Sequence, residues 1–279
     1  MWIDQNAISE PTFIVGMNGS GTTMLLDCLD NHEEMYGFPQ ETKIIPFFLS
    51  KLDCYGDLTC DDNFLSLFND FRKLSFFRYS NGGKSPPLPQ NWRYLRRSLS
   101  SIIDSVFCYF ARREGKVRWC EKTPMHALHI QRLSKLFPHA KFIHMIRDGR
   151  ACAASFYRRW HFNPELTMYR WKNIVREARR QGCGLKNRYM EVHYEHLTED
   201  PENVIKKICC FIHIRFNRRL LLVNRNRNYM GFSFKKIVPN TKTFNDSLSC
   251  RQLNRIEIIG GNLLNELGYK TEYPYSDID

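Results

Sequence analysis

Hydrophobic and polar positions form the same compound pattern twice along the chain. Thr12–Met17 is a short run of apolar, β-branched and aromatic residues that meets a glycine-rich turn, and Thr23–Leu29 then has helical character. The order returns at Lys141–Ile146, which is followed by the polar turn Arg147–Arg150 and the helix-compatible segment Ala151–Trp160. Each pattern predicts a strand, a loop and a helix.

Further segments predict a parallel sheet. Ala127, Ile130, Leu133 and Phe137 recur every three or four residues, which predicts an amphipathic helix that ends at Pro138. A helix between two buried strands predicts that these strands run parallel, because a crossover connection returns the chain to the end of the sheet at which the first strand began.

Two more strands and another helix extend the alternation. We expect strands at Val117–Cys120 and Arg188–Tyr194, and a helix at Glu202–Phe211 that begins after Asp200 and Pro201. Strands that alternate with helices predict an α/β fold with three layers, in which helices flank a central parallel sheet.

One region departs from this alternation. Residues 51–115 are rich in aromatic side chains and mostly helical in character, with turns at Asn81–Gly83 and Ser85–Pro89. We interpret the region as a helical insertion over the carboxyl edge of the sheet, within a single domain that spans residues 1–279.

Composition indicates a globular protein. The 279 residues are 43% hydrophobic and 25% charged, and they contain no apolar run of the length that spans a membrane. Met1–Glu10 lacks the order of a secretory signal, and the ten cysteines include no C-x-x-C pair. We therefore expect a soluble cytoplasmic protein with reduced, mostly buried thiols and no membrane partner.

Charge is unevenly distributed along the chain. The net charge is +12, yet residues 1–62 carry only Lys43 and Lys51 against eleven acidic residues. The excess of basic residues therefore lies in residues 63–279. It predicts a ligand with several negative charges, either a nucleic acid or a polyphosphorylated small molecule.

The first glycine-rich loop has the spacing of a phosphate-binding loop. Gly16–Thr23 satisfies G-x-x-x-x-G, but Thr22 stands where a nucleotide triphosphatase needs lysine. The backbone N–H groups and the following helix N-terminus can still bind a phosphate. A glycine turn that only joins strand to helix is the alternative.

The second loop adds groups suited to a phosphate monoester. Arg147 follows a predicted strand, and Ser155 lies eight residues later in the following helix. Arginine supplies a bidentate fork and serine a hydroxyl donor. A solvated helix start capped by Asp148 is the alternative reading of either residue taken alone.

Four segments in this order resemble the sulfotransferases that use 3′-phosphoadenosine 5′-phosphosulfate (PAPS). The segments are FIVGMNGSGTTMLLDCLDNH, WCEKTPMH, FPHAKFIHMIRDGRACAAS and VHYEHLTEDPENVIKKICCFI, and the terminal LLNELGY is similar to the last helix of that family. The resemblance implies a P-loop-type fold and an enzyme that moves a sulfuryl group from PAPS and releases adenosine 3′,5′-bisphosphate (PAP).

The resemblance also implies the residues of a donor site. The 5′-phosphosulfate would be held by the loop residues Asn18, Gly19, Ser20, Gly21, Thr22 and Thr23. Arg147 and Ser155 would hold the 3′-phosphate, and Tyr194 matches a position that often contacts adenine. Tyr194 could equally be an ordinary tyrosine at the sheet edge, and Lys242 could close on the cofactor or be a solvated loop lysine.

Gly19 departs from the family pattern, because many members carry a basic residue at this position. Lys122, at the end of a predicted strand, is the best substitute for that cation, and a surface lysine paired with Glu121 is the alternative. The segment Gly37–Pro46 is similar to the stretch that bears the catalytic glutamate in tyrosylprotein sulfotransferases, which implies Glu41 as the general base.

Alternatives to Glu41 remain at this stage. Glu41 could instead be a glutamate at a helix N-terminus, stabilised by the helix dipole. The base could also be a histidine that lies near the end of a motif. These are His32, His126, His144 and His193.

The acceptor is the part of the reaction that these motifs define least. We expect a soluble small molecule with a hydroxyl or amine, and aspartates in the insertion could select a cationic natural product or could simply be solvated. These are Asp53, Asp57, Asp61, Asp62 and Asp70. The alternatives are a peptide tyrosine or glycan acceptor, or a P-loop kinase or NTPase.

No metal or nucleic-acid partner is expected. The pair His126 and His129 lacks further ligands at a known spacing, and no helix-turn-helix, zinc or RNA-binding signature accompanies the basic residues.

Overall fold

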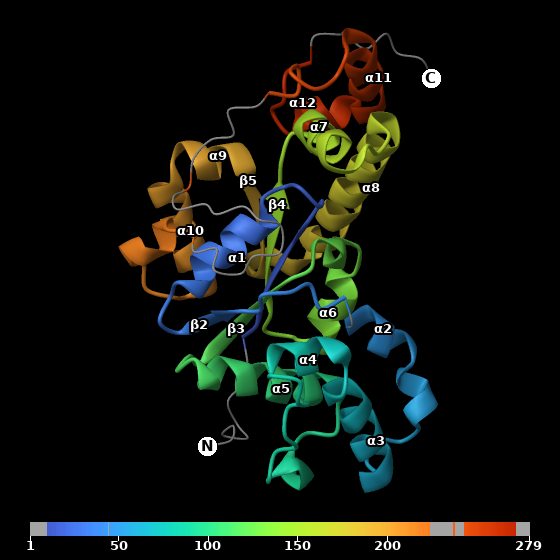
Figure 1. The fold of residues 1–279 in the computed structure, drawn as a ribbon, viewed down its shortest axis with the longest axis vertical. Coiled ribbons are helices and arrows are strands. Elements are labelled where there is room, and N and C mark those ends of the chain that lie inside the picture. The colour runs from blue at the N-terminus through green and yellow to red at the C-terminus, as the bar shows by residue number, and fades with distance from the viewer. Residues whose placement is uncertain (1–9, 44, 224–236, 238–242, 272–279) are drawn as a thin grey trace.

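A five-stranded parallel sheet organises the fold (Figure 1). The computed structural model describes residues 10–43, 45–223, 237 and 243–271. All neighbouring strands are parallel, in the order β2 (Met35–Gly37), β3 (Arg118–Lys122), β1 (Thr12–Gly16), β4 (Lys141–Ile146) and β5 (Tyr189–His193). The predicted α/β class with a central parallel sheet is confirmed.

Helices cover both faces of the sheet because both faces are apolar. In β1, Ile14 packs with α1 (Thr22–Asp30) and α10 (Pro201–Ile212), whereas Phe13 and Val15 belong to the core on the opposite face. Successive residues of a strand point to opposite sides, so a strand buried on both faces is apolar throughout. Figure 1 shows these layers.

The second face and the strand ends carry the remaining helices of the αβ core. They are α6 (Ile130–Leu136), α7 (Gly149–Trp160), α8 (Pro164–Gly182) and α9 (Tyr194–Glu199), with 3-10 turns at Pro124–Leu128, Cys183–Arg188 and Arg218–Leu221. The helix predicted around Ala127–Phe137 is therefore two elements. His129, with φ −130°, interrupts it between the 3-10 turn and α6.

The region 51–115 is helical, as expected, but its packing differs from the expectation. It contains α3 (Asp61–Arg72), α4 (Ser75–Ser80) and α5 (Leu99–Arg113), with short 3-10 turns at Leu52–Tyr55 and Trp92–Tyr94, and it follows α2 (Ile45–Ser50). Helix α5 packs against β2 and β3, where Phe107 stacks on Phe38 at 4.5 Å between ring centroids. The insertion thus extends the aromatic core beside β2 and β3.

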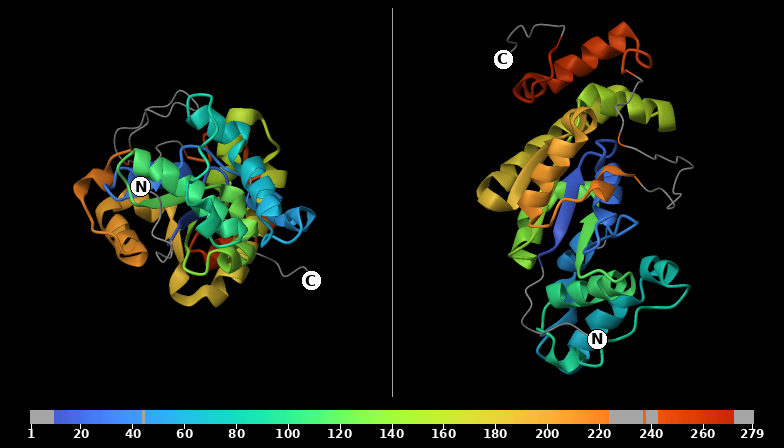
Figure 2. Two further views of the ribbon diagram at one scale, coloured as in Figure 1. Left: turned by 90° about the horizontal axis from the view of Figure 1, so that it is seen from below. Right: turned by 90° about the vertical axis from the view of Figure 1, so that its left-hand side faces the viewer.

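The two ends of the molecule are built from different parts of the chain. In Figures 1 and 2, α3, α4 and α5 lie at one end of the long axis, and α11 (Cys250–Gly260) and α12 (Asn262–Glu266) lie at the other. The sheet and its glycine loop lie between them.

Two expectations about the whole chain can be compared with this structure. Within the described residues, no helix combines the length and apolar character needed to cross a bilayer. All ten cysteines are free thiols; five are buried and five are exposed, so the expectation of mostly buried thiols is half met.

Candidate functional site

The glycine loop leaves the start of α1 open. Gly21 precedes the helix with φ 94°, and among the described residues no side chain is seen to cap the first N–H groups. A side chain here would collide with Tyr194, because a Cβ on Gly21 would lie 2.6 Å from the ring atom Cδ2. The hydroxyl of Ser20 is buried and has no hydrogen-bond partner in the described part of the chain. Uncapped helix N–H groups and an unpartnered hydroxyl together form a cradle for an anion.

Arg147 joins this loop to the second strand–loop–helix unit. Its Nη1 donates to the carbonyl of Gly19 at 2.9 Å, and its guanidinium lies 4.2 Å over the ring of Tyr194. The side chain is buried, and its Nε has no partner among the described residues. Arg147 therefore holds a charge and an unused donor beside the glycine loop, and burial raises the pKa of the Tyr194 hydroxyl beneath it.

The backbone that carries Arg147 is fixed from two sides. Trp171 donates to the carbonyl of Arg147 at 2.9 Å, and the N–H of Asp148 donates to Glu195 at 3.1 Å. Asp148 caps α7 by accepting from the N–H of Arg150, as the alternative reading of this segment supposed. Arg147 and Ser155 are both buried, so the alternative of a solvated helix start does not describe them.

Gly19 has a backbone conformation that disfavours a residue with a side chain, including the basic residue expected at this position from the family resemblance. Its φ is 88°, a conformation that costs residues with a side chain about 1–2 kcal/mol. Its carbonyl is also the acceptor for Arg147. The cations of the site come from other elements of the fold.

Glu41, on the segment that follows β2, and Lys122, at the end of β3, form an ion pair. Lys122 Nζ lies 3.1 Å from Oε1 of Glu41, and Lys43 Nζ lies 3.4 Å from Oε2. The side chain of Lys122 is 7% exposed, whereas that of Lys43 is 70% exposed. Lys122 is thus a buried cation paired with Glu41, which excludes the alternative of a surface lysine paired with Glu121.

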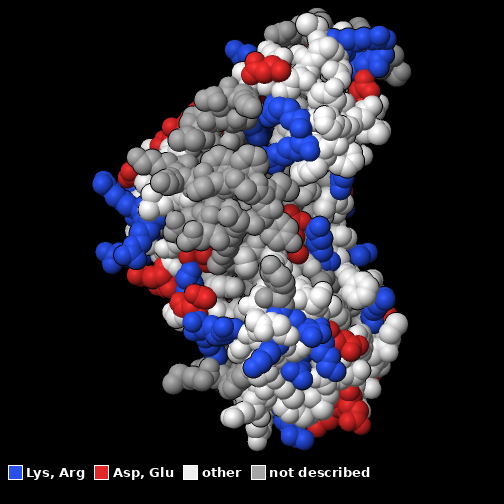
Figure 3. Space-filling model, viewed as in Figure 1, with Lys and Arg blue, Asp and Glu red and all other residues white. Residues whose placement is uncertain are grey.

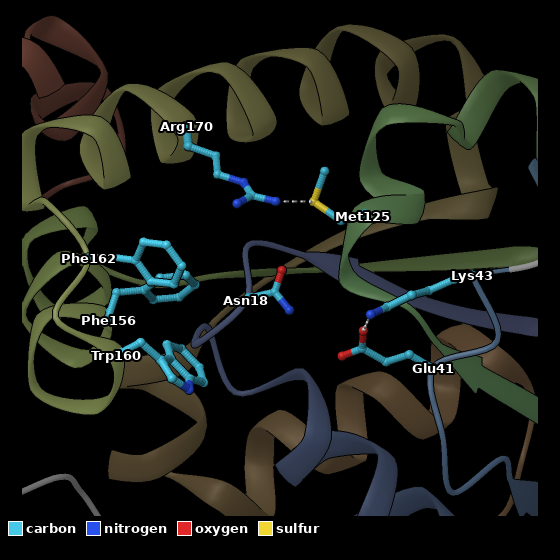
Figure 4. A pocket seen from close by; sticks show the side chains of 8 residues that line it. All are labelled: Asn18, Glu41, Lys43, Met125, Phe156, Trp160, Phe162 and Arg170. Carbon is cyan, nitrogen blue, oxygen red and sulfur yellow. Dashed lines mark hydrogen bonds and ion pairs between the residues drawn. The ribbon is translucent and has the colours of Figure 1, made fainter.

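A cavity of about 270 Å³ lies beside this ion pair (Figure 4). Figure 4 shows aromatic side chains on one side, Glu41 and Lys43 on the other, Asn18 between them, and Arg170 with Met125 above. The aromatic side chains are Phe156, Trp160 and Phe162, here called the aromatic wall, and their ring centroids are 4.9 to 6.4 Å apart. No lining residue comes from the insertion at 51–115.

The four histidines considered as alternative bases make hydrogen bonds elsewhere, and none of them lines this cavity. His126 pairs with Glu121, His144 with the hydroxyl of Tyr189, His32 with the carbonyl of Arg215, and His193 with the hydroxyl of Tyr269. Burial lowers the pKa of His144 to about 3, so it is neutral near pH 7. Lys242, the candidate for closing on the cofactor, lies outside the described residues.

Three of the five aspartates of the insertion have partners of their own. Asp61 pairs with Arg93 and Arg97, Asp70 accepts from Tyr55, and Asp57 accepts from the N–H of Thr59. These contacts give no support for a cationic acceptor. On the face drawn in Figure 3, Lys and Arg gather in several clusters with Asp and Glu between them.

Metal ligands do not gather in the described part of the chain. No three His, Cys, Asp or Glu side chains there are placed so that they could hold one ion. The independence from metal that we expected is therefore a matter for experiment.

Residues 11–218 match the sequence profile described as the sulfotransferase family. The chain belongs to this family. Its likeness to a putative protein-tyrosine sulfotransferase of Caenorhabditis briggsae is 28% identity, over 93% of this chain and 89% of that protein. Protein-tyrosine sulfotransferase 1 of Danio rerio is 26% identical over 75% of this chain, and the match spans 54% of the zebrafish protein.

Solved structures agree with this fold. The sulfotransferase domain of the Synechococcus PCC 7002 olefin synthase has a TM-score of 0.53 at 22% identity and covers 94% of this chain and 98% of its own. The sulfotransferase domain from the curacin biosynthetic pathway has a TM-score of 0.53 at 18% identity, covering 98% and 95%. In this sulfotransferase, sequence motifs predicted the glycine loop and the loop that carries Arg147, but not the aromatic wall, Arg170 or the surroundings of Glu121.

Proposed function

We propose that this sulfotransferase moves a sulfuryl group from PAPS to the phenol oxygen of a tyrosine in a peptide. The observation that carries the proposal is that Glu41 and the aromatic wall face each other across one cavity, next to the glycine loop. An aromatic wall suits an aromatic acceptor, because rings stack offset or edge to face. The names of the relatives also favour a peptide tyrosine over the soluble small molecule that we first expected.

The unpartnered groups of the donor side fit the phosphates of PAPS. The open start of α1 and the Ser20 hydroxyl would hold the 5′-phosphosulfate, together with the neighbouring loop residues Asn18–Thr23. Arg147 and Ser155 would hold the 3′-phosphate, and Tyr194 would lie near the adenine. PAPS supplies a sulfuryl group on a good leaving phosphate.

The transfer assigns a separate task to each member of the ion pair. Glu41 accepts the proton of the acceptor hydroxyl while the acceptor oxygen forms a bond to sulfur. The bond from sulfur to the phosphate oxygen breaks, and that oxygen keeps the electron pair. Lys122 stabilises the charge that grows on it. Because Lys122 contacts Glu41 at 3.1 Å, a short movement toward the leaving oxygen would also free Glu41 for the proton.

The test is transfer to matched peptides. The protein is incubated with PAPS and either a tyrosine peptide or the same peptide with phenylalanine, and mass spectrometry measures the gain of a sulfuryl group. We expect transfer to the tyrosine peptide alone, and loss of transfer in Glu41→Gln. Transfer to phenols or amines of a metabolite extract, with none to the peptide, would contradict the peptide acceptor.

Turnover is expected to survive EDTA. The developing charge is met by the helix start and Lys122, so no magnesium is required to neutralise it. Activity that disappears with the chelator and returns with magnesium would contradict this assignment and favour a phosphoryl transferase.

A further inference from the structure

A buried carboxylate lies directly behind the proposed catalytic pair. Glu121, on β3, is fully buried, and it sits in the strand position that pairs with Phe13 of β1. An ionised carboxylate in such a place is costly unless donors surround it. The proposed reaction gives Glu121 no role.

The donors around Glu121 come from two segments far apart in sequence. Oε1 accepts from the N–H of Thr42 at 3.2 Å, from the hydroxyl of Thr42 at 2.9 Å, and from the hydroxyl of Thr123. Oε2 pairs with Nδ1 of His126 at 3.0 Å. Burial raises the pKa of Glu121, but His126 and the two threonines outweigh it, so the net pKa is lowered.

The residues that make these contacts are the chain neighbours of Glu41 and Lys122. Thr42 follows Glu41 in the chain, and Lys122 lies between Glu121 and Thr123. The N–H of Lys43 also donates to the hydroxyl of Thr123, at 3.4 Å. One carboxylate therefore ties the segment that bears the base to the strand that bears the cation.

The backbone next to this contact is held in an unfavourable conformation. Lys43 has φ 49°, in the left-handed region that residues with side chains rarely adopt. Such a conformation persists only where the surrounding contacts determine it, and it is frequent at functional sites. The bonds from Thr42 to Glu121 and from Lys43 to Thr123 are the contacts that fix the turn.

We infer that Glu121 is a positioning residue, which holds Glu41 and Lys122 in register through Thr42 and Thr123. The inference rests on the proposed roles of Glu41 and Lys122 in sulfuryl transfer. It assigns Glu121 an effect on the rate of transfer, with no contact to the donor phosphates. A merely structural carboxylate would instead affect the whole fold.

Removal of the carboxylate should separate rate from binding. Glu121→Ala is expected to lower kcat about tenfold to a hundredfold, because misplacement of a catalytic group by about 1 Å costs that much. The affinity for PAP should change less than about twofold. Glu121→Gln should restore most of the rate, because its carbonyl oxygen can still accept from Thr42 and Thr123.

Asp104 on α5 provides the matched control. It accepts from Nε1 of Trp119 at 2.8 Å, and Trp119 lies two residues before Glu121 on the same strand. Asp104→Asn should keep kcat. A fall of PAP affinity by the same factor as kcat in Glu121→Ala, together with a lowered melting temperature, would overturn the inference. A general loosening of the fold would then explain the lower rate.

A triple variant decides whether Glu121 acts through Glu41 and Lys122. In the background that carries both Glu41→Gln and Lys122→Met, the further change Glu121→Ala should lower the rate less than about threefold, whereas independent effects would multiply. Multiplied effects would overturn the inference. If Glu41→Gln itself kept its rate, the proposed mechanism would fail instead, so the two failures are distinguishable.

A milder change covers the case in which Glu121→Ala does not fold. Thr42→Val keeps the shape of the side chain and removes one donor to Glu121. It should lower kcat severalfold with unchanged PAP affinity. An unchanged kcat in this variant would overturn the inference.

Discussion

The proposed donor and acceptor sides of this site differ in how deeply their groups are buried. The proposed donor side joins the carboxyl ends of β1 and β4; its Ser20, Arg147 and Ser155 are buried. Arg147 is held there by contacts with Gly19, Tyr194 and Trp171. On the acceptor side, Trp160 is 41% exposed and Phe162 is 56% exposed. Under the proposed function, the donor would therefore be held in a largely buried cradle, whereas the acceptor would meet a partly exposed aromatic wall that can admit a larger partner.

The ion pair lies where the two sides meet. Lys122 belongs to a central strand and is buried, whereas Glu41 lies on a connecting segment and is 23% exposed. In the proposed reaction, Lys122 would therefore act on the donor and Glu41 on the acceptor. The comparison predicts that variants of the ion pair change rate, that variants of the donor cradle change PAP affinity, and that variants of the aromatic wall change acceptor affinity.

The largest effect is expected for Glu41→Gln. Glutamine keeps the shape but cannot accept the proton of the acceptor, and loss of a general base costs about a hundredfold to ten-thousandfold in rate. The affinity for PAP, measured by calorimetry, should remain close to that of the unchanged protein. Near-normal turnover of this variant across pH would assign the base to another group.

The second largest effect is expected for Lys122→Met, with a loss of about a hundredfold to a thousandfold in rate. The charge that Lys122 stabilises grows only as the bond from sulfur to oxygen breaks. Lys43→Met is the matched control, since Lys43 contacts the other oxygen of Glu41 but is largely exposed. Single-turnover rates and PAP affinities separate the two roles. A parallel fall of rate and affinity in Lys122→Met would mean that Lys122 binds the ground state.

Arg147→Ala and Ser155→Ala test the donor cradle. Loss of a charge-assisted contact costs about 1.5–3 kcal/mol, or roughly tenfold to a hundredfold in affinity. PAP binding should weaken by this factor, while binding of adenosine 5′-phosphate, which lacks the 3′-phosphate, should change little. Equal losses for both ligands would reject the assignment to the 3′-phosphate.

The sequence predicted the strands and loops that carry the proposed donor residues well because their signals are local. Buried runs such as Lys141–Ile146 indicate strands, and the polar loops after them contain Ser20 and Arg147 at the positions where the structure has the cradle. The three-residue strand β2 was not predicted, because three residues are too few to show a period. The resemblance to a family, rather than any pattern of spacing, pointed to Glu41.

The rest of the site depends on contacts between distant segments. Lys122 and Glu41 are 81 positions apart, and Glu121 meets Thr42 across 79. The sequence offered one signal for Glu121, its place beside Lys122 at the end of a predicted strand. The sequence does not show that the partner of Glu121 is Thr42. The aromatic wall was missed because Phe156 and Trp160 also fit the apolar stripe of an ordinary helix, and the turn at His161 brings Phe162 beside them.

The smallest effect is expected on the acceptor side, for Trp160→Ala. Trp160 contacts Phe156 at 4.9 Å between ring centroids and lines the cavity, and an aromatic contact contributes about 0.5–1.5 kcal/mol beyond its buried area. The KM for a tyrosine peptide should therefore rise about threefold to tenfold, with PAP affinity unchanged. Tyr94→Ala is the matched control, because Tyr94 is 72% exposed and lies on the insertion away from the cavity lining. If Trp160→Ala left the peptide KM unchanged, or lowered PAP affinity to the same degree, the division between a rigid donor cradle and an open aromatic acceptor surface would be wrong.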